Sequence, residues 1–479
     1  MPTKCHHPRL RPAFLPACVL FLGLFPFSPA LSFRLHDSKL LDGSRLRPQR
    51  RGVRGVRGVE APELTALSSE VSPSSRCTSS GVRSPPLSEV EGKLGVLFLN
   101  LGGPLNLEGV EPFLYNLFAD GEIIRLPKGL KWLQPLIAFV ISKARAPSSR
   151  EKYAAIGGGS PILEYTTQQA AAVERLLKSR GIRDVEAFVG MRYAEPFAES
   201  VVKEMLQSGV KRAVVVPLYP HYSISTSKSA LLSLMSERSF LGLPHTVVPH
   251  WYQREGFVEA VQGLIKKEIL SIPREAREKE GVHVLFTAHG VPESYIEEGD
   301  PYKDQMEHSV ALIAEKVQRS VPSSRMPLSH SLSFQSRVGP VTWLQPYTDD
   351  EIKKLAEEGV RNLIVVPISF VSEHLETLEE IDQEYREVAE EAGIRHWRRV
   401  PALNLDPRFL RDLADLVGDA LQSVPVRVEE ALDSSCCPAL VRSVESALGF
   451  EVGGGEGKKG GRVVGVQKEM EEREMSLQR

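Results

Sequence analysis

Short apolar runs rich in Val, Ile and Leu recur along the chain from residue 93 onward, each followed by a polar loop and a segment of helical period. This alternation is typical of parallel strands whose two faces are covered by helices. The pattern therefore predicts a mixed α/β fold built on parallel sheets.

The apolar runs occur twice in the same order. GVLFLNLGGP (95–104) is similar to HVLFTAHGVP (283–292), and SGVKRAVVVPLYP (208–220) is similar to EGVRNLIVVPISF (358–370). Two further pairs are AFVGMRYAEP (187–196) with SLSFQSRVGP (331–340) and VPHWYQREGFVEAV (248–261) with VPALNLDPRFLRDL (400–413). Chance similarity between apolar strands is the alternative, but it does not explain the preserved order. We predict two similar α/β domains of four strands each, at residues 93 to 270 and 280 to 424.

The first half is longer than the second, and its extra residues include LPKGLKWLQPLIAFVISKARAP (126–147). Apolar positions at helical spacing alternate there with basic ones, namely Leu130, Leu133, Ile137, Val140 and Ile141 with Lys128, Lys131, Lys143 and Arg145. Such a segment can lie in a membrane interface or form an apolar lip over a pocket, and a plain core helix fits equally well. No run after residue 93 reaches the roughly 18 apolar residues that a membrane-spanning helix needs.

Residues 1 to 90 have the composition of a targeting leader. An apolar stretch at 13–32 follows a short basic start, as in a signal peptide, and an Arg-rich, acid-poor, Ser/Pro-rich segment follows, as in a transit peptide. This order resembles the bipartite leaders of algae whose plastid lies inside the endomembrane system. We predict a disordered leader and plastid import; a secreted protein with a disordered pro-segment is the alternative. The segment at 453–479 is expected to be a flexible tail with a charged end.

Composition narrows the class of protein. The chain is 42% hydrophobic and 25% charged with a formal net charge of −2, and no basic stretch is interleaved with aromatics, so nucleic-acid binding is not expected. Of its five cysteines, only Cys436 and Cys437 lie near the predicted domains. Adjacent cysteines lack the spacing that lets two thiolates bind one metal ion, which favours an enzyme of a reducing compartment.

Candidate chemistry follows two strands of the second half. His289 comes directly after VLFTA, and Glu373, His374 and Glu376 come shortly after IVVPISF. Ligands of open parallel sheets bind outside the carboxyl ends of the strands, so these side chains should share one crevice.

A row of acids follows the same strand. A helix opening at Ser372 would carry Glu376, Glu380 and Glu384 on one face, at spacings of four residues. Like charges at this spacing repel unless a cation is shared, so the row predicts a path for a divalent cation, with a solvated face as the alternative for Glu384.

The glycine-rich run GGGSP (157–161) is a second candidate for ligand binding. It follows a basic segment rather than a strand and lacks GxGxxG spacing, so it is a weak nucleotide signal. Backbone N–H groups and Ser160 beside Arg145 suit a ligand carboxylate better.

Several strings together resemble the ferrochelatase family over residues 93 to 424. They are LNLGGP (99–104), EKYAAIGGGSPI (151–162), VGMRYAEP (189–196), VPLYPHYS (216–223), FTAHGVP (286–292), DPYKDQ (300–305), QSRVGPVTWLQPYTD (335–349) and SFVSEHLETLEEIDQEY (369–385). The resemblance implies two Rossmann-like domains without a nucleotide, each a four-stranded parallel sheet, and a porphyrin cleft between them. It implies insertion of ferrous iron into protoporphyrin IX to form protoheme, the last step of heme synthesis.

The resemblance also implies roles for single residues. His289 would accept pyrrole protons, Glu376 would be its acidic partner, and His374 and Glu373 would tune the site. Arg192 and Tyr193 would lie on the opposite porphyrin face near a route for iron, while Arg145 and Ser160 would hold propionates. Further porphyrin contacts would come from Tyr153, Leu114, Leu117, Phe118, Val140, Ile141, Val338, Trp343 and Phe370. The metal ligands would be His289, Glu376, Glu380 and Glu384.

The chemistry asks for these residue types, because two pyrrole protons must leave while a divalent ion enters. Ferrous iron is then a substrate, and no permanently bound cofactor is expected. Some relatives bind an iron–sulfur cluster through a C-terminal cysteine set and a cysteine at the place of Ile224, but two cysteines cannot supply four ligands, so no cluster is expected here.

Three points stay open at this stage. The alternatives to a protoporphyrin enzyme are a coproporphyrin ferrochelatase and a non-catalytic porphyrin- or heme-binding module, whose hallmark would be loss of His289 or Glu376. Peripheral membrane contact is expected from the segment at 126–147. The oligomeric state is open, and a homodimer is one of the possibilities.

Overall fold

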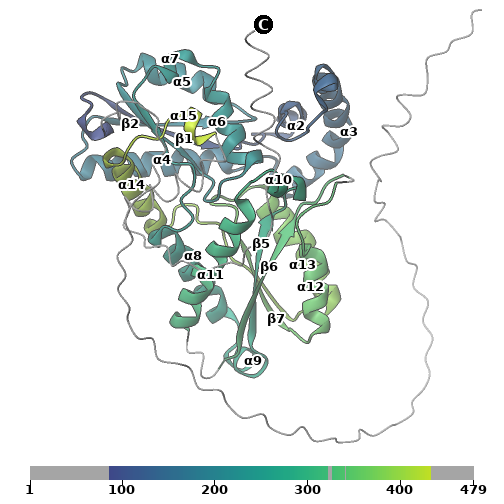
Figure 1. The fold of residues 1–479 in the computed structure, drawn as a ribbon. Helices are drawn as coiled ribbons and strands as arrows, with labels where there is room; N and C mark the ends of the chain where they lie inside the picture. The colour runs from purple at the N-terminus through teal and green to yellow at the C-terminus, as the bar shows by residue number, and fades with distance from the viewer. Residues whose placement is uncertain (1–85, 322–325, 340, 433–479) are drawn as a thin grey trace, which may run out of the picture. The chain divides into compact units, whose positions relative to one another are not determined.

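Two parallel four-stranded sheets form the framework of the protein (Figure 1). The computed structural model describes residues 86–321, 326–339 and 341–432, so the predicted leader up to residue 85, the tail at 453–479 and both Cys436 and Cys437 lie outside the described residues. The strands are β1 (Leu94–Asn100), β2 (Val185–Met191), β3 (Arg212–Pro217), β4 (His245–Val247), β5 (Val282–His289), β6 (Leu328–Gln335), β7 (Asn362–Pro367) and β8 (His396–Arg399). The sheet orders are β2-β1-β3-β4 and β6-β5-β7-β8, with every neighbouring pair parallel. The identical order confirms the predicted repeat.

Helices cover both faces of each sheet, which is why the central strands β1 and β7 are buried along their whole length. In the first half the helices are η1 (Leu87–Glu89), η2 (Leu107–Gly109), α2 (Val110–Ala119), η3 (Lys128–Leu133), α3 (Gln134–Ala155), α4 (Ile162–Ser179), α5 (Ala198–Gln207), η4 (Ile224–Lys228), α6 (Ser229–Leu234), α7 (Arg238–Leu241) and α8 (Glu255–Ser271). In the second half they are α9 (Arg274–Glu280), α10 (Glu293–Glu297), α11 (Tyr302–Ser320), α12 (Thr348–Glu357), η5 (Glu376–Glu384), α13 (Tyr385–Ala392), α14 (Pro407–Gln422) and α15 (Val428–Ala431).

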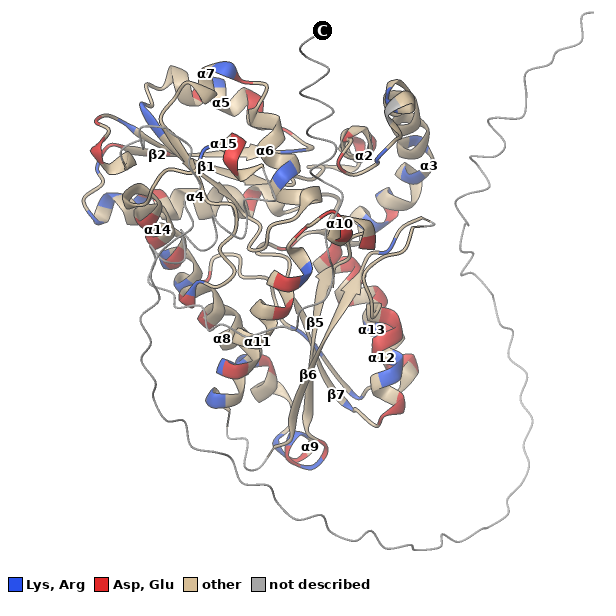
Figure 2. Cartoon of the chain, in the orientation of Figure 1, with Lys and Arg blue, Asp and Glu red and all other residues tan. Residues whose placement is uncertain are grey.

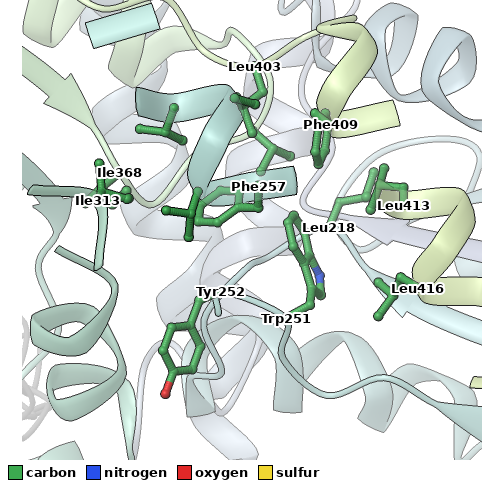
Figure 3. Close-up of a cluster of buried hydrophobic side chains, with 14 of the residues drawn as sticks. Leu218, Trp251, Tyr252, Phe257, Ile313, Ile368, Leu403, Phe409, Leu413 and Leu416 are labelled. Carbon is green, nitrogen blue, oxygen red and sulfur yellow. The ribbon is translucent and has the colours of Figure 1, made fainter. Parts of the chain in front are cut away.

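The two halves exchange their last long helices. α8, from the first repeat, packs on α11 and β7 of the second, while α14, from the second repeat, packs on α4 and β3 of the first. Where α8 and α14 meet, the Trp251 ring stacks on Phe409 and packs edge-on against Phe257 (Figure 3). A single apolar core therefore runs through both halves. The predicted boundary between residues 270 and 280 separates two repeats of sequence, but each repeat completes the core of the other.

The segment at 126–147 folds as a 3-10 turn, η3, followed by the first half of α3. Up to residue 147, the residues that α3 buries are small ones, Ala138, Ser142 and Ala146, and α3 packs on α2. The bulky apolar residues are exposed instead, namely Leu130, Trp132, Leu136, Phe139 and Val140. The segment is thus no ordinary core helix. No helix in the described part of the chain is long and apolar enough to cross a bilayer.

A π-helix follows the third strand of each sheet, η4 after β3 and η5 after β7. The prediction of a helix opening at Ser372 was wrong, because η5 begins only at Glu376. Gln169 donates to the Ser372 hydroxyl (3.0 Å) and Asn404 accepts the Glu373 N–H (3.0 Å), and these contacts hold the chain in a non-helical link.

Candidate active site

His289 is the last residue of β5, and its backbone is held on both sides by two hydroxyls. Its N–H donates to Ser369 Oγ (3.0 Å), its carbonyl accepts the Tyr302 hydroxyl (2.9 Å), and the two hydroxyl oxygens are 2.8 Å apart. The three contacts form a closed ring in which each group donates once. Ser369 and Tyr302 were not among the predicted site residues, although Tyr302 lies in the DPYKDQ string that carries the resemblance.

His374 and Glu376 lie beside His289, as the strand-end argument predicts. His374 Nε2 is 3.0 Å from Glu376 Oε2, without the alignment of a hydrogen bond. The Phe370 ring packs edge-on against both imidazoles, with its centroid 4.2 Å from that of His374 and 6.2 Å from that of His289. Residues from two separate segments of the sequence therefore meet at the carboxyl edge of the second sheet.

The charges of this group are set by burial and by one another. Burial lowers the pKa of His289, and His374 lowers it further, against the opposing effect of Glu376. Burial alone would raise the pKa of Glu376, but His374 and His289, together with smaller effects of a backbone N–H and Lys152, hold that pKa below its usual value. Near neutral pH the site thus offers a neutral imidazole next to a carboxylate, which is a proton acceptor beside a group that stabilises positive charge.

The predicted row of acids on η5 does not converge on one point. Glu380 accepts from Ser336 Oγ (2.6 Å) and from the Tyr385 hydroxyl (2.9 Å), and burial raises its pKa. Glu384 is instead paired with Lys152 (2.6 Å). Within the described residues, no group of three or more His, Cys, Asp or Glu side chains is arranged to hold a metal ion. The metal roles of Glu380 and Glu384 stay predictions.

The Glu373 carboxylate makes its contacts outside the group of His289, His374 and Glu376. Its carboxylate pairs with Arg399 (2.9 Å) and accepts from Thr377 Oγ1 (2.5 Å) and the Ala402 N–H (3.1 Å). These partners occupy both carboxylate oxygens, so Glu373 fixes the link before η5. Its predicted role in tuning the His289 site is not supported by a direct contact and stays a prediction.

Arg192 and Tyr193 are organised by Asp120, a residue that sequence reasoning missed. Asp120 pairs with Arg192 (2.9 Å) and accepts from the Tyr193 hydroxyl (2.7 Å) and from Ser229. Burial alone would raise the pKa of Asp120, but the Ser229 hydroxyl, the Glu122 N–H and Arg192 together hold this pKa below its usual value. The only signal in the sequence was one acid at the end of the apolar segment FLYNLFAD.

Apart from Phe370 beside the imidazoles and the exposed Val140, the predicted apolar contacts fall into two groups. Leu114, Phe118 and Tyr153 are buried in one cluster with Tyr193, and Leu117, Ile141 and Leu375 of the second half pack against it. In the other group the Trp343 indole donates to the Val338 carbonyl (2.8 Å), and its ring lies against Gly290, where a side chain would collide.

Arg145 and Ser160 make separate contacts. Arg145 lies over the Phe118 ring, 6.0 Å from its centroid, whereas Ser160 is buried against Gly103 and its Oγ accepts the N–H of Ile162, the first residue of α4 (3.4 Å). Within the described part of the chain no hydrogen bond joins Arg145 to Ser160, and their pairing around a carboxylate stays a prediction.

The ferrochelatase family model matches residues 93 to 421. The chain is 48% identical over 361 residues to Ferrochelatase-2, chloroplastic, of Oryza sativa subsp. indica, which covers 74% of this chain and 67% of the relative. It is 50% identical over 344 residues to the ferrochelatase of Synechococcus elongatus, with 71% and 85% covered. Identity to Ferrochelatase-1, chloroplastic/mitochondrial, of Arabidopsis thaliana is 48% over 372 residues, with 75% and 77% covered. The resemblance seen in the sequence is confirmed, and the chain belongs to the ferrochelatase family.

Proposed function

We propose that this chain is a ferrochelatase that inserts ferrous iron into protoporphyrin IX and releases protoheme. The observation that carries the proposal is the meeting of neutral His289 with the Glu376 carboxylate at the carboxyl edge of the second sheet. The porphyrin loses two pyrrole protons as Fe²⁺ enters, so the product core is neutral. His289 accepts the two protons one after the other and passes each to solvent water, and Glu376 stabilises the imidazolium that forms each time.

The porphyrin site is proposed to lie between this group and the first half. Tyr153 and Leu375 bring the apolar cluster of α2 and α3 next to η5. Burial raises the pKa of Tyr153, and the charge of nearby Glu376 raises it further. An apolar wall suits the flat macrocycle, while Arg192 and Tyr193, fixed by Asp120, supply polar groups to its other face.

Anaerobic incubation of the protein with Fe²⁺ and protoporphyrin, followed by absorption, tests the reaction. Heme formation that is lost in His289→Ala, with folding unchanged by circular dichroism, is the expected result. Heme formation at the wild-type rate in His289→Ala would remove the assigned base. Tight porphyrin binding without metal insertion would show a binding module, and faster turnover of coproporphyrin in parallel would change the substrate.

We further propose peripheral contact with a membrane through η3 and α3. Trp132 is 75% exposed and Leu136 59% exposed, with exposed Lys131 beside them. Apolar residues flanked by cations suit the surface of an anionic bilayer. Co-sedimentation with anionic vesicles should fall in Trp132→Ser/Leu136→Ser, and equal binding by wild type and variant would contradict the proposal.

A plastid location and activity without an iron–sulfur cluster complete the proposed function. The chloroplastic relatives and the composition of the leader support the location. Ile224 is buried in the apolar core, where its side chain offers no thiolate, which supports cluster-free activity. Iron and acid-labile sulfide analysis of purified protein tests the second point.

A further inference from the structure

Lys152 ties the last turn of α3 to the acidic π-helix η5. Its Nζ lies 2.9 Å from Glu379 Oε2 and 2.6 Å from Glu384 Oε1. Glu379 keeps only 10% of its side chain exposed, while Lys152 keeps 34%. One ammonium therefore bridges two carboxylates from successive turns of η5, a contact between segments more than two hundred residues apart in sequence.

The same ammonium acts on two further acids of η5, Glu376 and Glu380. Its positive charge is among the causes that lower the pKa of Glu376 and that oppose the rise in the pKa of Glu380. α13, which continues directly from η5, and the neighbouring α12 add further Asp and Glu side chains (Figure 2). Lys152 is thus a tethered cation inside a row of four carboxylates.

We propose that Lys152 competes with the incoming divalent metal ion for the carboxylates of η5 and so sets the apparent affinity of the enzyme for its metal substrate. This inference rests on the proposed function. A divalent ion prefers the same carboxylate oxygens that the ammonium occupies, and it must approach against the ammonium's charge. The flexible stem and partial exposure of Lys152 let the ammonium swing aside when the metal ion arrives.

A purely structural strut between α3 and η5 is the competing explanation. A strut fixes the apolar cluster that faces the porphyrin, so its loss would change the KM for porphyrin or the stability of the fold. A competing cation changes the KM for the metal ion and leaves the KM for porphyrin alone.

The experiment compares initial rates of wild type, Lys152→Met, Lys152→Gln and Lys152→Arg under anaerobic conditions, with Fe²⁺ varied at saturating protoporphyrin and the reverse. Lys316→Met is the matched control, because Lys316 also bridges two glutamates, Glu255 (3.1 Å) and Glu259 (3.2 Å), with 33% exposure. We expect the KM for Fe²⁺ to fall roughly threefold to tenfold in the two neutral Lys152 variants, with Lys152→Arg and Lys316→Met near wild type.

An unchanged or higher KM for Fe²⁺ in folded Lys152→Met and Lys152→Gln would overturn the inference, and so would a change confined to the KM for porphyrin. Calorimetric titration with Co²⁺ alone, in the absence of porphyrin, gives a second measurement. Tighter Co²⁺ binding by Lys152→Gln supports the inference even if wild type makes no heme, an outcome that would count only against the proposed function. Equal Co²⁺ affinity counts against the role of Lys152.

Discussion

Removing the Ser369 hydroxyl should cost both stability and turnover, because Ser369 makes two of the three contacts in the ring around His289. The bonds to the His289 N–H (3.0 Å) and to the Tyr302 hydroxyl (2.8 Å) are lost in Ser369→Ala, while the bond from Tyr302 to the His289 carbonyl can persist. A half-buried backbone N–H is left without its acceptor, which costs about 1–3 kcal/mol of unfolding free energy.

Turnover should fall because the base loses its alignment. A displacement of about 1 Å at a reacting group lowers the rate by up to roughly a hundredfold, so we expect kcat of Ser369→Ala to fall by about tenfold or more. The KM for porphyrin should change little, since Ser369 supports the backbone of His289 and has no assigned contact with the porphyrin.

Urea unfolding and steady-state rates on the same preparations measure both effects. Ser369→Thr keeps the hydroxyl and serves as the control, and Tyr302→Phe with the double variant gives the coupling between the two hydroxyls. Additive losses of stability in this cycle, or a Ser369→Ala protein with wild-type stability and kcat, would refute the ring as the support of His289.

Three further outcomes follow from charges. Because burial lowers the pKa of His289 and the pKa of Glu376 is also lowered, the acid limb of kcat/KM should lie below pH 6.5, and a limb above that value would contradict the neutral imidazole. Burial lowers the pKa of His221 to about 3, so its contribution to stability is complete above pH 6.5 and is lost as the pH falls and the unfolded chain takes up the proton. His221→Gln should therefore flatten the decline in urea-unfolding free energy between pH 6.5 and 4.5. Arg254→Met breaks the ion pair with Asp412 (2.8 Å) at the junction of the exchanged helices and should lower the unfolding free energy by about 3 kcal/mol in the same assay. An unchanged unfolding free energy would show that this ion pair does not stabilise the junction.

The sequence predicts the sheets well because the strands are local apolar runs that occur twice. It also brings His289, His374 and Glu376 together, since the carboxyl ends of neighbouring parallel strands share an edge. The exchange of α8 and α14 was not predictable in this way, because an amphipathic helix specifies that one face is buried and leaves the partner open.

Other contacts depend on tertiary structure alone. The link before η5 stays non-helical because Gln169 and Asn404 hold it. The spacing of the acids in η5 fits an α-helix as well as a π-helix. Asp120 and Lys152 could be named as polar residues from the sequence, but their partners lie on distant segments. The hydrophobic pattern of the sequence therefore locates a site on an edge of the sheet. Which polar residues complete that site depends on the tertiary structure.

The support of His289 continues into the first half of the protein. The Tyr302 N–H donates to Asp300 Oδ1 (3.0 Å), and Asp300 Oδ2 accepts from Ser223 Oγ (2.9 Å) and the Ile224 N–H (2.8 Å) at the start of η4. The base thus ends a buried strand and is anchored, through hydrogen bonds, to the π-helix of the other repeat. Proton removal needs a fixed acceptor, whereas a metal ion must exchange partners as it passes. The duplicated fold meets the first need, because Tyr302 and Asp300 tie the end of β5 to the other repeat.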